Sequence, residues 1–380
     1  MTTSASSHGS TSDSSSAFGR IAHTTVRLSE PGDLIAAIPA LLGFTPTRSI
    51  VAICLSGETR PTLGAVMRHD LILGEGHGLS DVMRMAVDQF ATVCGRDGAS
   101  GMLVVFVDDR LGSERHRSSV VDVVEYLEDA VNRQGVELID SYLTAQIREG
   151  CEWFSLLPDG ESGRQSDPVA SRVALAQVLG GRVIRGSRRE LEQLVEVDPT
   201  VNSVRIGALI DQAYDGSTGS RDLESERNDP HSGHRRELAF VLDEIAELAS
   251  GHDPHPETSA QLALALANVT VRDCLLALAV GDRAEAAESM WMLLCRRLPD
   301  PERAGPASLL GFSAYVRGDG PLAGVALAAA LDSDPDHNLA RMLDVALQSG
   351  VRPTVVRELA DVGFGCARTL GVQLPPPTDV

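Results

Sequence analysis

The sequence predicts two parts of different fold class: an α/β N-terminal domain with a mixed sheet flanked by helices, and an all-α C-terminal domain of helical hairpins. In the first half, apolar runs of strand length alternate with amphipathic helical patterns. In the second half the apolar patterns have the helical period. The polar stretch 215–233 between them holds Leu223 as its only large apolar residue. We therefore expect a disordered tail at 1–19, the α/β domain at 20–214, a linker at 215–233, the all-α domain at 234–365 and a C-terminal tail at 366–380.

Strands and helices are expected to alternate in the first half. Ser29 and Pro31 predict a helix start, and Pro39 is expected to kink or shorten that helix. Caps are expected at Ser80 and at Ser118 or Ser119. The expected order is a strand at 24–28, a helix at 29–42, a buried strand at 50–55, an antiparallel strand at 62–73, a helix at 80–94, a buried strand at 102–107, a helix from 118 to 131, a strand at 136–145, a hairpin strand at 151–156, and helices at 168–179, 188–196 and 201–214.

The second half is expected to contain helices throughout. These lie at 236–249, 258–267, 270–280, 283–297, 305–317, 321–332, 337–348 and 353–362.

A weak internal repeat runs through these helices. Gly281–Asp282 recurs as Gly318–Asp319, and Asp300–Pro301 recurs as Asp334–Pro335, after about 34 to 37 residues in each case. Residues 304–337 resemble one tetratricopeptide (TPR) repeat, whose tryptophan and tyrosine positions are alanine here. The matching positions are Leu310, Gly311, Ala323, Leu327, Ala330 and Pro335. The resemblance implies a TPR-like stack of hairpins, although one fair copy and one poor copy do not make a true array.

Composition excludes several kinds of chemistry. The chain has 380 residues and a formal net charge of −20, and all 33 of its basic residues are arginine. Without lysine there is no Walker A lysine, no lysine Schiff base and no lysine nucleophile. The acidic balance argues against a nucleic-acid partner, because phosphate neutralisation needs a basic face. We expect no membrane span and no export signal, because no apolar window is long enough and the N-terminus lacks an apolar core.

The six cysteines are scattered and none forms a CxxC pair. Four of them lie in apolar segments, where a thiol behaves as a small hydrophobic group. This pattern is typical of a reducing cytoplasm, and we expect no disulfide framework.

Polar residues at the ends of two strands form the main candidate site. Arg68, His69 and Asp70 end or interrupt the strand at 62–73, and Asp108 and Asp109 follow the strand at 102–107. Ligands of layered α/β domains bind beyond the carboxyl ends of strands, so these residues could share one cleft. Asp108 or Asp109 would act as metal ligand or base, His69 as acid or base, and Arg68 as an anion clamp. The alternative is a set of solvated charges and helix caps.

Two weaker patterns each have a functional and a structural interpretation, and the tryptophans have only a structural one. The glycines of 74–78 precede a helix and could bind phosphate, but the third glycine of GxGxxG is missing and Glu75 would repel an anion, so a connecting loop is the alternative. The cluster Arg182, Arg185, Arg188 and Arg189 could bind an anion or pair with the chain's own acidic surface. The two tryptophans, at 153 and 291, are expected in the core.

Two His-x-x-His pairs could hold zinc. They are His231 with His234 and His252 with His255, and they flank the helix expected at 236–249. That helix would hold the two pairs about 20 Å apart, which disfavours one shared site. Solvated loop histidines are the alternative, and we expect no metal and no other cofactor.

Several segments resemble the actinobacterial domain of unknown function 4192 family. They are 28–55, 66–71, 147–157, 271–278 and 309–353, and the resemblance covers about 24–362. It implies a lineage and a shared architecture, without an activity. Members often carry a cysteine-bearing loop after the tryptophan hairpin, whereas this chain has Leu-Pro-Asp-Gly at 157–160, so no metal role of that loop is carried over.

The function expected from these observations is protein interaction or regulatory binding in the cytoplasm, without catalysis. An unidentified protein partner would bind the C-terminal helical domain, because stacked helical pairs form concave binding surfaces. The alternative is a small-molecule enzyme or ligand-binding protein that uses the strand-end cleft of the α/β domain.

Overall fold

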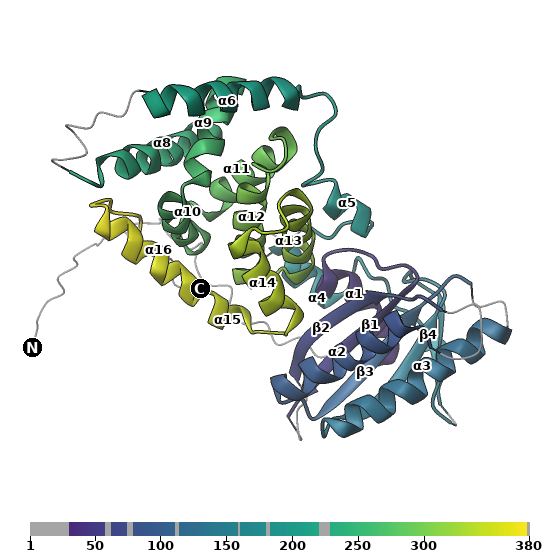
Figure 1. Cartoon of the computed structure of the whole chain (residues 1–380). Helices are drawn as coiled ribbons and strands as arrows, with labels where there is room; N and C mark the ends of the chain where they lie inside the picture. Colours follow the sequence, from purple (N-terminus) through teal and green to yellow (C-terminus); the bar gives the residue numbers. More distant parts are fainter. Residues whose placement is uncertain are drawn as a thin grey trace, which may run out of the picture.

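A computed structural model describes residues 30–57, 62–73, 79–110, 114–158, 160–179, 183–219 and 229–377. The expected tail at 1–19, the strand expected at 24–28, the glycine segment 74–78 and residues 220–228 of the expected linker lie outside these residues. The described part confirms a mixed sheet with helices in the first half and helices in the second (Figure 1).

The sheet has the strand order β2-β1-β3-β4-β5-β6. Its strands are β1 (Ser49–Ser56), β2 (Thr62–Asp70), β3 (Gly101–Val107), β4 (Glu137–Thr144), β5 (Glu152–Ser155) and β6 (Ser162–Arg164). β3 and β4 are parallel, whereas the other neighbouring strands are antiparallel. The strands expected within the described residues are therefore confirmed, whereas the polar edge strand β6 was missed because its three residues carry no apolar pattern.

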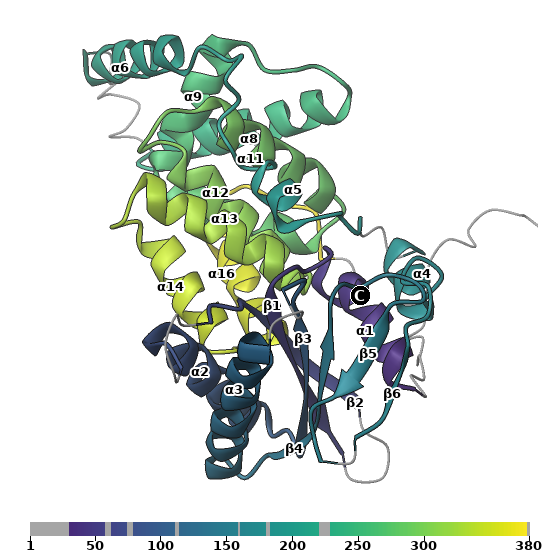
Figure 2. The ribbon, with the colours of Figure 1, turned by 90° about the vertical axis from the view of Figure 1, so that its right-hand side faces the viewer.

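Helices cover both faces of the sheet (Figure 2). α2 (Asp81–Asp97) and α3 (Glu114–Arg133) pack on one face, against alternate residues of β1 such as Ile50 and Ala52. α1 (Pro31–Leu42) packs on the other face, against Val51 and Ile53. The central strand is thus buried on both sides, which is why its sequence is a continuous apolar run.

Helix starts were harder to predict than the helices themselves. The Ser80 side chain accepts a hydrogen bond from the Met83 amide and caps α2, as expected. The caps expected at Ser118 or Ser119 are wrong, because α3 already begins at Glu114 and both serines lie inside it. α1 continues through Pro39 to Leu42, so that proline does not shorten it.

The expectation of unpaired cysteines is wrong for Cys54 and Cys94. They form a disulfide between β1 and α2, with Cα atoms 5.7 Å apart and both side chains fully buried. They are separated by 40 residues, so only the packing of α2 on the sheet brings them together. The free cysteines include Cys274 and Cys295, whose pKa burial raises to about 12, so that their thiols stay protonated at neutral pH.

The second half consists of α8 (Ser232–Ala249), α9 (Pro256–Ala267), α10 (Val269–Leu275), the 3-10 helix η1 (Leu276–Val280), α11 (Ala284–Arg297), α12 (Ala304–Val316), α13 (Gly320–Ser333), α14 (Asn338–Gln348), α15 (Pro353–Val356) and α16 (Glu358–Thr369). α12 and α13 form a tight hairpin. A Cβ at Gly311 would lie 2.8 Å from the Leu327 side chain, so this glycine permits their close approach. Trp291 is buried in this core, and Trp153 is buried under the sheet, as expected for both.

Three helices connect the halves: α4 (Arg172–Leu179), α5 (Arg188–Glu192) and α6 (Ser203–Gly219). α4 packs on α1, where Val173 and Ala174 meet Ala37 and Ala40. α6 instead lies along α9 in the helical half (Figure 1). The chain therefore crosses between the halves before α5, upstream of the polar stretch.

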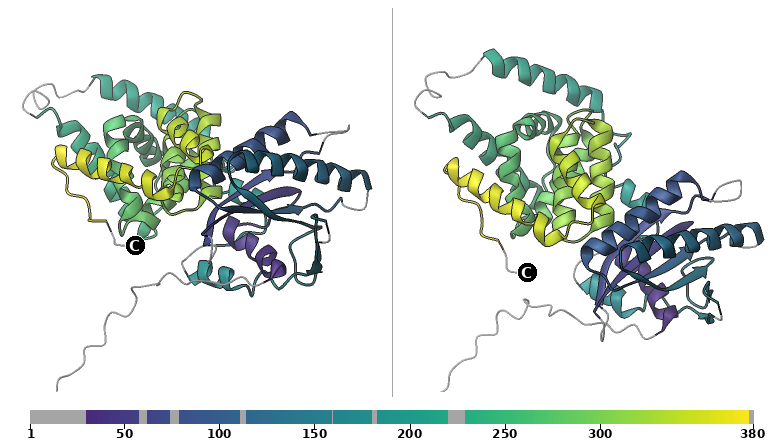
Figure 3. Two further views of the ribbon diagram at one scale, coloured as in Figure 1. Left: turned by 90° about the horizontal axis from the view of Figure 1, so that it is seen from below. Right: turned by 60° about the horizontal axis from the view of Figure 1, so that its bottom comes forward.

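The two halves pack directly against each other (Figure 3). One continuous apolar core runs from β1 and α1 into the helices of the second half. A second contact joins α2 to the segment after α14, where a Cβ at Gly350 would lie 2.5 Å from Val93. Beside it Arg352 binds the Asp97 carboxylate at 2.9 Å.

In the described part of the chain, no single helix combines the length and apolar composition of a membrane crossing. α9 together with α10 and η1 passes that test only as a pair bent by 96°.

Candidate functional site

The polar residues at the strand ends do gather along one edge of the sheet. Ser49, the first residue of β1, lies opposite Asp70 of β2 and opposite Val107 of β3. Asp108 follows directly, and its amide donates to the Thr144 carbonyl at the end of β4. The strand topology thus brings the predicted residues to one edge, and their individual partners decide what they can do.

Asp108 is fully buried and bound by Arg110. Its Oδ1 accepts from the Arg110 amide at 3.1 Å and from Arg110 Nε at 2.7 Å, and its Oδ2 accepts from Arg110 Nη2 at 3.1 Å. Arg110 also donates to the Leu71 carbonyl at 3.3 Å. A buried carboxylate needs such partners to offset its lost hydration. Asp108 therefore ties the end of β3 to the end of β2, and its lone pairs are occupied.

Asp109 is exposed and held by a different arginine. Arg48 Nε donates to Asp109 Oδ1 at 2.7 Å and Nη2 donates to Oδ2 at 3.2 Å. These hydrogen bonds and the guanidinium charge hold the pKa of Asp109 below its usual value. Arg48 has a φ of 44°, and its carbonyl accepts from the Leu71 amide at 2.7 Å. The low pKa makes Asp109 a poor general base at neutral pH.

Arg68 is a nearly buried clamp between strands. Its side chain is 9% exposed, its Nε donates to Ser49 Oγ at 2.9 Å, and its Nη2 donates to Asp70 at 2.5 Å. The guanidinium carbon lies 5.9 Å from the centre of the Phe44 ring, within cation–π range. Burial lowers the Arg68 pKa while Asp70 opposes that shift. Because Arg68 is nearly buried and already donates to Ser49 and Asp70, its guanidinium group is poorly placed to bind an anion.

His69 lies on the opposite face of β2 from Arg68, because successive side chains of a strand alternate. Its Nδ1 lies 2.8 Å from the Asp70 carbonyl. The five predicted residues therefore share one edge of the sheet without converging as a catalytic group, since three of them are bound by arginines and the histidine points elsewhere.

The histidine pairs lie at the two ends of α8, and His234, in its first turn, has a buried Nδ1 without a hydrogen-bond partner among the described residues. His252 pairs with Glu247, with Nδ1 and Oε2 3.3 Å apart, and His231 precedes α8. No three His, Cys, Asp or Glu side chains come together as a metal site anywhere in the described ranges. Arg188 and Arg189 bind Glu192 and Glu196, so they pair with the chain's own acidic surface; Arg182 lies outside the described residues.

A groove that the sequence analysis missed lies where α14 meets α2. Its volume is about 400 Å³, and its lining residues are Asp88, Gln89, Thr92, Val93, Arg96, Asp344, Val345, Gln348 and Ser349. Two lining residues from opposite helices are in direct contact: Gln89 Nε2 donates to the Gln348 carbonyl at 2.9 Å and to Gln348 Oε1 at 2.7 Å. The groove therefore joins the α/β half to the helical half.

Large apolar side chains stand exposed on the two helices that form this groove. Val345 of its lining is 64% exposed; Met342, one turn before it, is 49% exposed; and Met85, one turn before Gln89, is 72% exposed. The sequence carries a signal for them, because Met85 lies off the buried stripe of α2 and Met342 and Val345 lie off that of α14. What the sequence does not show is that the two helices meet.

Comparison with known proteins identifies one family and no characterised relative. A family model described as "Domain of unknown function (DUF4192)" matches residues 31–354. No curated protein matches, and no solved structure matches.

Proposed function

We propose, for a chain that belongs to the DUF4192 family, a function as a protein-interaction module without catalysis of its own. The observation that carries this proposal is the groove between α2 and α14, which is lined by the exposed Val345, with exposed Met85 and Met342 one turn away from lining residues on the same two helices. Contiguous exposed apolar groups are uncommon on monomeric proteins and mark contact surfaces.

The groove suits an α-helix of a partner protein. Its two walls are helices joined by the Gln89–Gln348 hydrogen bond, and an apolar stripe of a partner helix would lie between them against Val345. Met85 and Met342, each one turn before a lining residue, are exposed and unbranched, and such side chains adapt to the shape of a partner. An amphipathic helix presents apolar residues at the spacing this surface needs.

Charge further defines the partner helix. Asp344 lines the groove, and its carboxylate has no hydrogen bond or ion pair within the described part of the chain. The whole chain carries a formal charge of −20, so long-range attraction also favours a cation. We therefore expect the partner helix to place an arginine or lysine beside its apolar stripe, opposite Asp344.

The helical half supports the same proposal. The α12–α13 hairpin, with Gly311 packed on Leu327 and with Ala323 and Ala330 fully buried, supports a TPR-like interpretation of 304–337. α14 packs on this hairpin as a further layer and contributes the exposed Val345 to the groove. The arginine partners of Asp108 and Asp109 support binding over catalysis, because they bind the two carboxylates that the catalytic alternative would use as base or metal ligand.

Photo-crosslinking in the cells that produce the protein tests this proposal. The full chain would carry a benzophenone amino acid at Val345 in the groove, or at Val204 on α6 as a control, which is 82% exposed. We expect a discrete adduct from position 345 only, joined to an amphipathic helical peptide with a basic residue. The change Asp344→Asn should reduce its yield. The proposal would be overturned if position 345 gave no adduct, or if positions 345 and 204 gave equal adduct yields.

A further inference from the structure

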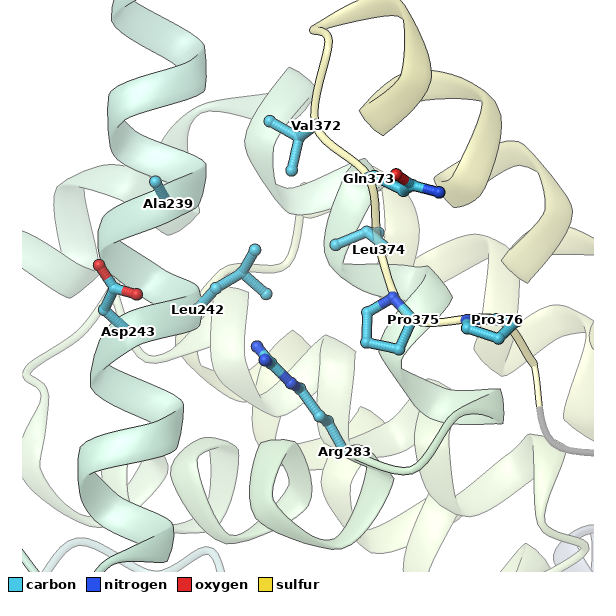
Figure 4. A pocket seen from close by; sticks show the side chains of 9 residues that line it. All are labelled: Ala239, Leu242, Asp243, Arg283, Val372, Gln373, Leu374, Pro375 and Pro376. Atoms are coloured by element: carbon cyan, nitrogen blue, oxygen red, sulfur yellow. The ribbon is translucent and has the colours of Figure 1, made fainter.

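A second pocket lies in the helical half, away from the groove. Its volume is about 530 Å³, within the range of small-molecule sites. Its walls come from α8, from the start of α11 and from the C-terminal segment 372–376 (Figure 4). The lining residues are Ala239, Leu242, Asp243, Arg283, Val372, Gln373, Leu374, Pro375 and Pro376.

The C-terminal wall is fixed at both ends, so the cavity is preformed. Gly371 has a φ of 76° and ends α16, where the Val372 amide donates to the Ala367 carbonyl at 2.9 Å and turns the chain back. Arg235 of α8 donates to the Leu370 carbonyl at 2.9 Å beside this turn. Further on, Leu374 is buried, and a β-bridge joins Pro377 to Gly281.

Two opposite charges line this pocket, the half-buried Arg283 and the exposed Asp243. The Arg283 side chain extends into the space between α8 and the C-terminal segment, and Asp243 stands on the α8 wall (Figure 4). Neither side chain makes a hydrogen bond or ion pair with the described residues.

We infer that this cavity binds a small zwitterion with an aliphatic body, an apolar α-amino acid. Arg283 presents the planar fork that a carboxylate accepts in bidentate fashion. Asp243 is the counter-charge for the α-ammonium group, and it disfavours ligands that carry only negative charge. The aliphatic side chain would pack against Leu242, Val372 and Leu374, which form the apolar part of the lining.

The ligand's own groups can be removed one at a time to test this assignment. The full chain would be titrated calorimetrically with L-leucine, with leucinamide, which lacks the carboxylate, and with 4-methylpentanoate, which lacks the ammonium. We expect saturable binding of leucine and at least tenfold weaker binding of leucinamide. Absence of saturable leucine binding, or equal binding of leucinamide, would overturn the inference.

Variants of the protein give the matching half of the test. Arg283→Gln should weaken leucine binding at least tenfold, and Asp243→Asn should weaken binding of leucine but not of 4-methylpentanoate. The control is Arg236→Gln, an exposed arginine of α8 outside the cavity lining, which should bind as the unaltered chain does. Unchanged leucine binding by Arg283→Gln would contradict the assignment. If that variant does not fold, the three ligands on the unaltered chain still decide it.

Discussion

Arg352 joins the helical half to Asp97 at the last turn of α2. Its Nε donates to the Asp97 carboxylate at 2.9 Å and its Nη2 donates to the Asp97 carbonyl at 3.1 Å. The carboxylate is 13% exposed, whereas the arginine is 65% exposed and keeps contact with water. The pair fixes the position of α2 against the segment after α14, and therefore the shape of the groove above it.

Removing this link should cost little stability but change the groove. Arg352→Ala is expected to lower the free energy of unfolding by about 0.5–1 kcal/mol, since solvent screens a largely exposed guanidinium. Urea unfolding measures this loss. Arg341→Ala, whose ion pair with Asp336 spans 4.0 Å, should be silent within error. Equal losses in the two variants would mean that the Arg352 link contributes nothing specific.

Gly350 should tolerate no side chain. It has a φ of 67°, and an added Cβ would lie 2.5 Å from Val93 Cγ1. Gly350→Ala is therefore expected to destabilise the protein by about 2 kcal/mol or more, from backbone strain and overpacking together. The matched control is Gly43→Ala, because Gly43 has a φ of 74° and nothing within 4 Å of the added Cβ. Thermal unfolding of both variants separates strain from collision.

The collision has its own test. In the double variant Val93→Ala with Gly350→Ala, the added methyl group has space. The double variant should therefore lose less free energy of unfolding than the two single variants lose together. Strict additivity would show that α2 and the Gly350 turn do not touch in solution.

Asp108 should prove structural. Asp108→Ala leaves Arg110 and its amide without their acceptor, and we expect a loss of about 2–4 kcal/mol in the free energy of unfolding. Asp108→Asn, which keeps the shape and one oxygen acceptor, should lose less. Denaturant unfolding followed by circular dichroism checks both. A variant Asp108→Ala that is as stable as the unaltered chain would reopen the catalytic interpretation of this residue.

How far the sequence predicts this edge of the sheet depends on the range of the contacts. Strand ends follow from local apolar runs, so Asp70 and Asp108 could be placed together. The arginine that binds Asp109 could not be found in this way, because Arg48 and Asp109 are 61 residues apart in the sequence and pair only once β1 and β3 are aligned. The groove is more remote still, since Gln89 and Gln348 are separated by 259 residues. The sequence shows that α2 and α14 carry apolar residues off their buried stripes, but it does not show that the two helices lie side by side.

His337 should make stability depend on pH. Its Nδ1 accepts from the Ala340 amide at 3.3 Å and caps α14, a role that needs the neutral ring. Burial, and then the charge of Arg272, lower the His337 pKa. A lowered folded-state pKa means that this stability is present above the unfolded value of about 6.5 and is lost as the pH falls through it toward the folded value.

The replacement His337→Asn isolates this contribution. Asparagine caps helices well and does not titrate in this range. Between pH 7.5 and pH 5.5 the unaltered chain should lose up to about 1 kcal/mol more stability than the variant, the usual value of an N-cap bond. Parallel pH profiles for the two proteins would show that the cap is not titrating.

The packing of α6 determines where genetic recombination could exchange the two halves of such a protein without loss of stability. α6 lies on α9, with Arg205 bound to Glu257 at 3.1 Å, and the Asp198 carboxylate accepts from Arg296 at 2.8 Å. A genetic exchange that broke the chain at the polar stretch after α6 would part that helix from the surface it covers. A crossover between α4 and α5 would instead move α5 and α6 with the helices they stabilise. We therefore expect related chains that have traded halves to be joined before residue 188.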